Sequence, residues 1–402
     1  MPLLSPFRGM RPPRDFAAKL ACPPYDVVSA VEARAMAAGR PESFFHISRP
    51  EIDLPPDTDE HADAVYLKGL ENLRAFEARG WLKQDGSEHF YLYRQKMGEH
   101  EQTGLVAVAG VDAYDDGRIK KHELTRQDKE DDRTRHIEAL RANDEPVFLT
   151  YRANPNVDAL VTELTQAPPE SDFTADDGVQ HTFWVIPTAQ SARVAETLEP
   201  IHTLYIADGH HRSAAASRVH HRLSAERGGH GRFLVVAFPH DQMQVLAYNR
   251  VVKDLHGLTP EAFGEQLREK FDFKVGSSRP SHVHQFGMFL DGQWYRLTAR
   301  PHSFDATPTG VLDVTILQKN VLEPLLGIAD PRSDGRIAFV GGIRGTDELE
   351  KLVSSRAHRV AFSLFPTTLE QLMAIADVNG MMPPKSTWFE PKLRSGLVVH
   401  PF

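Results

Sequence analysis

The sequence of this 402-residue chain predicts an α+β or mixed α/β fold. Short apolar runs typical of strands, and longer runs with apolar residues at helical spacing, occur along the whole chain. The two kinds of run mix without strict alternation, which is typical of this fold class. Hydrophobic residues make up 41% of the chain and charged residues 25%, so the chain can bury a large core and form two or three domains.

The net charge and the cysteine count exclude several classes of protein. The formal net charge is -9 at pH 7, whereas a protein that coats nucleic acid needs a basic face. The single cysteine, Cys22, excludes a disulfide within the chain and a multi-cysteine zinc site. No run approaches the ~18 apolar residues of a membrane span, and the first residues lack the apolar core of a secretory signal. We therefore expect a cytoplasmic protein without nucleic-acid or membrane partners; its oligomeric state stays open.

The N-terminal third predicts helices followed by strands. Ser29 and Glu32 form the S-x-x-E pattern of a capped helix, and Gly39 ends that helix. Apolar residues at helical spacing predict a second helix that ends at Gly80. The elements expected next are strands at residues 89–97 and 104–114 and a charged helix capped by Thr125 with Asp128.

The middle of the chain predicts several short elements. Two apolar runs, at residues 232–239 and 245–252, predict a hairpin. The pattern changes after about Thr259, so we expect a domain boundary near residue 255, with regions 1–255 and 256–402. The other elements expected here are strands at 146–152, 179–187 and 204–207 and helices at 157–166, at 189–198 and from Ser213.

The C-terminal region predicts a further set of strands and helices. Asp291–Gly292 marks a hairpin turn, and residues 311–326 form a strongly apolar helical run. The remaining elements are a helix at 260–271, two strand-then-helix segments at 336–353 and 359–380 (the first with its helix capped by Thr346), and a strand at the end of the tail.

The run from Asp208 to Arg212 predicts an anion-binding turn. It joins a short buried strand to a helix, and Gly209 lets the backbone approach a ligand closely. Basic residues at a helix N-terminus cost roughly 0.3–1 kcal/mol each unless an anion is bound. The free N–H groups of the first turn and the planar fork of Arg212 suit a phosphate. The alternative is a solvated turn with neutral histidines and an arginine paired to a local acid.

A metal site is the second chemical interpretation of this run. Adjacent helical residues point about 100° apart, so His210 and His211 cannot easily share one ion. Asp208 and His210 could share one with a distant histidine, such as His122 or His181, and would then favour a metal-dependent hydrolase. The anion site is the leading interpretation, and it predicts no metal ligands.

Several segments in one order resemble a prokaryotic family, number 1015 among the domains of unknown function. These segments are "PPYDVVS" (23–29), "SFFHISRPEIDL" (43–54), "HELT" (122–125), "ADGHHR" (207–212) and "PPKSTWFEPKLRSGL" (383–397). The "ADGHHR" run is similar to the phosphate loop of the ParB/sulfiredoxin superfamily, in which a G-x-x-R core precedes a helix. This resemblance implies a ParB/sulfiredoxin-like nucleotide-binding core in residues 1–255, with additional α/β elements.

Relatives within that superfamily differ in this loop. Sulfiredoxins have Gly-Cys-His-Arg, so His210 stands where their repair cysteine would be, and sulfiredoxin activity is not implied. ParB proteins have Gly-Glu-Arg-Arg and DNA-binding helices, which the acidic charge of this chain does not favour. The free serine kinases have Asp-Gly-His-x-Arg, which Asp208, Gly209, His210 and Arg212 match. That resemblance implies phosphorylation of L-serine from ADP or ATP, with Asp208 to Arg212, His211 included, at the nucleotide phosphates.

Other polar residues are candidates for substrate binding and proton transfer. By its order in the chain, Asp26 resembles the acidic residue that removes the hydroxyl proton in those kinases. Glu123, at an expected strand end, is an alternative base or a ligand for Mg²⁺. A solvated helix laced by i,i+4 pairs explains most of residues 128–135, although Arg133 could reach an anion. The expected substrate-binding residues are His122, Arg133, Lys385 and Ser386.

These observations predict a nucleotide-dependent kinase for a small hydroxy amino acid. Asp26, Glu123 and His210 are the catalytic candidates, with His210 stabilising the transferring group. A nucleotide-sensing regulator without catalysis and a metal-dependent hydrolase are the alternatives.

Overall fold

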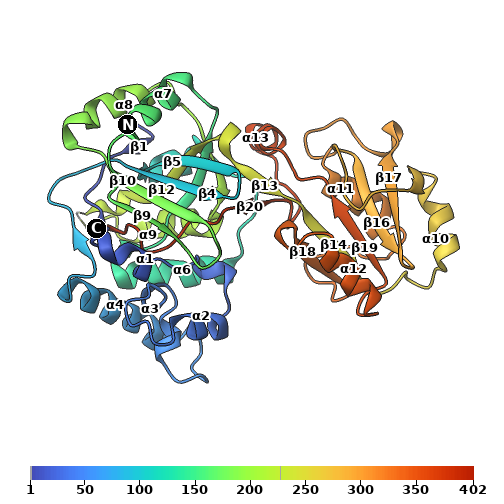
Figure 1. Cartoon of the computed structure of the whole chain (residues 1–402), viewed down its shortest axis with the longest axis horizontal. Helices are drawn as coiled ribbons and strands as arrows, with labels where there is room; N and C mark the ends of the chain where they lie inside the picture. Colours follow the sequence, from blue (N-terminus) through green and yellow to red (C-terminus); the bar gives the residue numbers. More distant parts are fainter. Residues whose placement is uncertain (1, 227) are drawn as a thin grey trace. The chain divides into compact units, whose positions relative to one another are not determined.

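The computed structural model describes residues 2–226 and 228–402, which fold into two compact units (Figure 1). The first unit contains the chain up to Met243 together with Pro391–Phe402, and the second contains Gln244–Glu390. The sequence predicts one boundary near residue 255. The structure instead changes unit at Gln244 and returns at Pro391, because the tail joins strand and bridge contacts of the first unit.

A mixed sheet forms the centre of the first unit. Among the described residues it has nine strands in the order β6-β11-β8-β12-β5-β4-β10-β9, and β1 pairs with β5. The β12–β8 and β11–β6 pairs are parallel and the others are antiparallel, so the mixed α/β prediction is confirmed. The strands are β1 Leu4–Ser5, β4 Tyr91–Met97, β5 His100–Gly110, β6 Ile119–Lys120, β8 Val147–Tyr151, β9 Ser171–Thr174, β10 Gln180–Val185, β11 Leu204–Asp208 and β12 Arg232–Pro239.

Helices cover both faces of this sheet because its central strands are buried along continuous runs, as in β8 and β12. Figure 1 shows α7 and α8 on one side of the sheet and α6 on the other. Val157 of α7 and Val194 of α8 belong to the same buried cluster as Leu105 of β5 and Val235 of β12. On α9, Ala215 and Val219 pack with Ile137 of α6. These helices are α5 Val111–Asp115, α6 Gln127–Leu140, α7 Pro155–Leu164, α8 Ser191–Leu198 and α9 His210–Arg222.

The N-terminal helices and the C-terminal tail share a second buried cluster. Phe44, Leu73 and Leu140 pack there with Val399 of the tail. The capping box of Ser29 and Glu32 is confirmed at the start of α2. The remaining elements of the unit are α1 Ala17–Leu20, α2 Ala30–Ala37, α3 Phe45–Ser48, α4 Asp63–Ala78, a 3₁₀ turn at Tyr25–Val27, and the short strands β2 Met10–Arg11, β3 Lys83–Gln84, β7 Ala142–Asn143 and β21 His400–Pro401.

The second unit is built on an antiparallel sheet in the order β15-β17-β16-β19-β14-β18. The hairpin predicted at Asp291–Gly292 joins β16 and β17 and is confirmed. The strands β13 and β20 of this unit pair with each other outside that sheet. The strands of the unit are β13 Gln244–Leu246, β14 Tyr248–Val252, β15 Phe271–Val275, β16 Gln285–Leu290, β17 Gln293–Ala299, β18 Ile337–Gly341, β19 Val360–Leu364 and β20 Trp388–Glu390. Its helices are α10 Pro260–Leu267, α11 Asp313–Leu317, a π-helical turn at Gln318–Leu322, α12 Asp347–Ser354 and α13 Leu369–Asp377.

Four local predictions are wrong. The expected hairpin of residues 232–239 and 245–252 does not form, because β12 pairs with β5 and β8, whereas β14 pairs with β18 and β19. Thr125 does not cap α6, because its hydroxyl donates a hydrogen bond to Glu130 instead. Thr346 likewise makes no side-chain cap at α12 and contacts Ser278. The solvated charged helix expected at residues 128–135 also differs, since Asp132 and Arg133 of α6 are buried.

The fold predicts that Gly396 holds the tail in place. Its φ is +89°, and a Cβ there would lie 2.6 Å from Leu20 Cδ2 and 2.8 Å from Phe44 Cβ. Gly396→Ala should therefore lower the free energy of unfolding by about 2–4 kcal/mol, through both backbone strain and overpacking. Gly98→Ala is the matched control, because Gly98 has φ +60° but nothing within 4 Å. Urea denaturation of both variants separates crowding from strain; equal losses would contradict the predicted crowding.

Candidate functional site

The predicted strand, glycine turn and helix are confirmed at residues 204–222. Strand β11 ends at Asp208, and α9 begins at His210. Gly209 joins them with φ +95°, a conformation that side chains with a Cβ rarely adopt. A Cβ there would also lie 3.1 Å from Arg212 Cζ and Nε, so the glycine leaves the space that the guanidinium uses.

The first turn of α9 keeps its N-terminal side free of side-chain caps. Gly209, at the N-cap position, offers no side chain, and among the described residues no cap hydrogen bond forms there. The carboxylate of Asp208 accepts a hydrogen bond of 2.8 Å from the Gly209 N–H. A helix start of this kind is positively polarised and favours negative charge.

Arg212 is buried within a group of acidic side chains. Its exposed fraction is 7%, and its Nη1 donates a hydrogen bond to the carbonyl of Pro146. Nη2 lies 3.7 Å from Asp26 Oδ2 and 3.8 Å from Asp208 Oδ1, and Nε has no hydrogen-bond partner. Burial alone would lower the pKa of Arg212, but Asp26 and Asp208 raise it above its ordinary value. The sequence predicts that the Arg212 guanidinium is open to a ligand. In the structure it is instead buried beside Asp26 and Asp208.

Lys392 supplies a second cation that the sequence analysis does not single out. Its Nζ lies 2.9 Å from Asp208 Oδ2. Burial would raise the pKa of Asp208, but Lys392 and Arg212 hold it well below its ordinary value. Lys392 stands 184 residues after Asp208 in the sequence, so no local pattern indicates the pair.

Glu145 is a buried acid that sequence reasoning also missed. Its Oε1 accepts hydrogen bonds from the Tyr25 N–H at 3.0 Å and the Ser395 hydroxyl at 2.7 Å, and its Oε2 has no partner. Burial and the neighbouring Asp144 raise the pKa of Glu145 to about 7. The side chain lines a cavity of about 10 Å³ together with Arg133 and Arg212, room for about one water molecule.

Asp26 and Arg133 reach this part of the unit from different elements. Asp26 lies in the 3₁₀ turn Tyr25–Val27, and its side chain is 36% exposed. Arg133 of α6 pairs with Asp132 at 2.8 Å, and its Cζ lies 4.0 Å from the centre of the Tyr25 ring. The structure therefore brings Asp26 beside Arg212, whereas Arg133 is already held by an acid and an aromatic ring.

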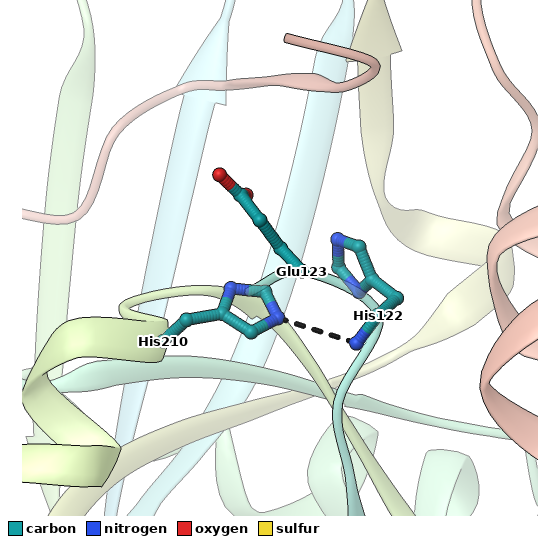
Figure 2. A group of neighbouring side chains, drawn as sticks. All are labelled: His122, Glu123 and His210. Carbon is teal, nitrogen blue, oxygen red and sulfur yellow. Dashed lines mark hydrogen bonds between the residues drawn. The ribbon is translucent and has the colours of Figure 1, made fainter. Parts of the chain in front are cut away.

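His122, Glu123 and His210 form a separate group beside Asp208 (Figure 2). One ligand atom from each of them lies within 4.8 Å of the others. The two imidazole rings meet edge to face, with their centres 4.5 Å apart. The backbone N–H of His122 points to His210 Nε2, with the two nitrogens 3.5 Å apart. Burial lowers the pKa of His122 to about 4, and burial with His122 nearby lowers that of His210 well below its ordinary value. Both imidazoles are therefore uncharged at neutral pH.

The other sequence candidates lie elsewhere. His211 diverges from His210, as predicted, and its Nε2 accepts a hydrogen bond from the Arg126 N–H at 3.1 Å. His181, in β10, bonds the Tyr93 hydroxyl at 2.7 Å and Arg394 Nε at 3.2 Å, so it is outside the histidine group. Lys385 and Ser386 belong to the second unit, where the Ser386 hydroxyl donates to the Pro383 carbonyl and the Lys385 carbonyl accepts from Arg250.

Comparison with known proteins gives the family of the chain. Residues 4–315 match the model of a protein family of unknown function, DUF1015. The chain belongs to this family. None of the curated proteins compared with it matches.

Solved structures that match along much of the chain share little sequence with it. A C-terminally truncated SbnI from Staphylococcus aureus is 13% identical, with 73% of this chain and 87% of that chain covered and a TM-score of 0.41. A mutant free serine kinase in complex with ADP is also 13% identical, with 73% and 92% covered and a TM-score of 0.36. A conserved hypothetical protein from Pyrococcus furiosus is 12% identical, with 73% and 95% covered and a TM-score of 0.34.

The helices show no membrane-spanning candidate. Among the described residues, none of them is both long enough and apolar enough to cross a bilayer.

The raised pKa of Glu145 predicts a pH-dependent stability. A carboxyl group whose pKa is higher in the folded state favours folding when protonated, so its contribution is lost as pH rises from about 4.5 to about 7. Glu145→Gln mimics the protonated acid. It should therefore gain stability relative to the parent between pH 5 and pH 8, on the order of 1–3 kcal/mol.

Thermal unfolding of both proteins across this pH range tests the prediction. Glu77→Gln is the control, because Glu77 is exposed on α4. A stability difference for Glu145→Gln that does not change with pH would contradict the assignment.

Proposed function

We propose that this protein binds the phosphates of ADP or ATP at the start of α9 and transfers one phosphoryl group to a small hydroxy amino acid, such as L-serine. The observation that carries the proposal is the uncapped first turn of α9, next to two cations, Arg212 and Lys392, and the half-exposed carboxylate of Asp26. Phosphoryl transfer depends chiefly on positioning and on charge stabilisation, which such a set supplies.

Arg212 has unused donor capacity for a phosphate. Arg212 Nη2 lies beyond hydrogen-bonding distance of both Asp26 and Asp208, and its Nε has no partner. Lys392 adds a second positive charge beside the helix start, with its Nζ 2.9 Å from Asp208 Oδ2. A phosphate oxygen at the helix start would thus meet the N–H groups of the first turn and both side chains.

Asp26 is the better candidate for the general base. The acceptor hydroxyl would attack the terminal phosphorus, the bond to the bridging oxygen would break, and the hydroxyl proton would pass to the Asp26 carboxylate. Arg212 lies 3.7 Å from this carboxylate, so the base and the phosphate clamp are neighbours. Glu123 is the alternative base. His210 is uncharged, so it would assist through a hydrogen bond or a coordinate bond rather than a positive charge.

A nucleotide-sensing regulator is the second candidate function. The buried position of Arg212 favours it, because a guanidinium with 7% exposure must move before it can fully clamp a phosphate. Such a movement on binding is the behaviour expected of a switch. A metal-dependent hydrolase is the third, favoured by the group of His122, Glu123 and His210.

Nucleotide binding should raise the thermal stability of the protein. At a hundredfold excess of ADP or ATP over Kd, the gain in the free energy of unfolding is about 2.7 kcal/mol. Arg212→Ala should weaken binding at least tenfold. Lys392→Met should do the same, and it remains informative if loss of the buried arginine unfolds the unit.

Lys83→Met serves as the matched control, because Lys83 is exposed in β3. Calorimetry and thermal melts with both nucleotides give the result. No heat and no shift in melting at millimolar nucleotide would rule out the proposed site.

Loss of the base should remove turnover and leave nucleotide binding. Asp26→Asn keeps the shape of the side chain but cannot accept the proton, so phosphorylated product should fall by about 100-fold or more. Glu123→Gln tests the alternative base, and Asp128→Asn, on the exposed side of α6, is the control. Mass spectrometry after incubation with nucleotide and an amino-acid panel measures the product. Turnover at the parental level in both Asp26→Asn and Glu123→Gln would favour the sensor.

A further inference from the structure

The group of His122, Glu123 and His210 joins two segments that are far apart in the sequence. His122 and Glu123 directly follow β6 and Lys121, and His210 is the first residue of α9. Figure 2 shows the Glu123 side chain rising between the two imidazole rings. The parallel pairing of β6 with β11 fixes this juxtaposition, because the residues after both strands emerge at the same edge of the sheet.

His122 has polar atoms that the protein does not satisfy. Its exposed fraction is 2%, and neither Nδ1 nor Nε2 has a hydrogen-bond partner. Buried polar side-chain atoms nearly always have a partner, and an exception points to a water molecule or an ion. The backbone N–H of His122 reaches His210 Nε2 at 3.5 Å, the upper limit for a hydrogen bond, so this contact holds the His210 ring only weakly.

We infer that His122, Glu123 and His210 bind a divalent transition-metal ion. Two imidazole nitrogens and one carboxylate oxygen are the donors that Zn²⁺, Fe²⁺ and Mn²⁺ take, and a three-ligand set leaves coordination positions open. Mg²⁺ and Ca²⁺ prefer sites built from oxygen alone. The two histidines beside Glu123 therefore favour a transition metal over the Mg²⁺ that the sequence suggests there.

The geometry requires only a small contraction around the ion. The three ligand atoms lie within 4.8 Å of one another. Ligands of a tetrahedral Zn²⁺ at about 2.0–2.1 Å from the metal are roughly 3–3.5 Å apart. Asp208 lies close enough to both histidines to raise their pKa values against the effect of burial, and it brings a negative charge beside the ion.

This site does not depend on the proposed function. An ion here would lie beside the first residue of α9, where the N–H groups favour an anion. Its open positions would suit an oxygen of a phosphate or of a water molecule. Metal binding measured without nucleotide therefore tests this inference alone, and nucleotide binding by the metal-free protein tests the proposed function alone.

The full chain, freed of metal by a chelator and free of any histidine tag, should bind one Co²⁺ or Zn²⁺ ion. Elemental analysis after dialysis gives the stoichiometry, and the visible absorption of bound Co²⁺ reports nitrogen and oxygen ligands. His210→Gln and Glu123→Gln should each weaken Co²⁺ binding by about tenfold or more. His122→Ala should abolish it, and a thermal melt shows whether that variant still folds.

His230→Gln is the matched control, because His220 and His230 form a second histidine pair, with their Nδ1 atoms 3.0 Å apart. Co²⁺ affinity in His230→Gln should equal that of the parent. Millimolar Mg²⁺ should not displace the Co²⁺. Either no bound ion after dialysis, or a loss of Co²⁺ in His230→Gln as large as in His210→Gln, would overturn the assignment.

Discussion

The burial of one guanidinium group organises the first unit. Removing Arg212 from water is unfavourable unless acids and carbonyl groups surround it. Asp26, Glu145 and Asp208, which contribute negative charge around it, come from three distant parts of the chain, and the Pro146 carbonyl accepts its hydrogen bond. The same acids then need partners of their own, which Lys392 and Ser395 supply from the tail. The site is thus one connected network in which each buried charged or polar group has a partner from a distant part of the chain.

The network explains why part of this site can be predicted from sequence and part cannot. The strand, Gly209 and the helix start are local features, because a left-handed turn requires a residue without a Cβ. The orientation of Arg212 is not local. Whether its fork faces a ligand or the interior depends on Asp26 and on Glu145, and the spacing of residues around position 212 carries no information about either.

The errors in the fold have the same origin. Residues 232–239 and 245–252 both have strand patterns and are close in the sequence, so a hairpin is the simplest expectation. Periodicity identifies a strand but not its neighbour, and β12 lies between β5 and β8 while β14 pairs within the second unit. Glu123 lies just after β6, close to the strand end that the sequence predicts, but the meeting of His122 with His210 depends on the β6–β11 pairing, which involves only a few residues.

The return of Pro391–Phe402 to the first unit has a consequence for the order of synthesis. Domains generally fold as they leave the ribosome, from the N-terminus onward. Strands β1 to β12 are available early, but Lys392 and Ser395 are made only after the entire second unit. During translation, Asp208 and Glu145 therefore lack their tail partners, and the polar network around Arg212 stays incomplete. A chain that ends anywhere between Met243 and Pro391 would carry the loop and the helix but not the finished site.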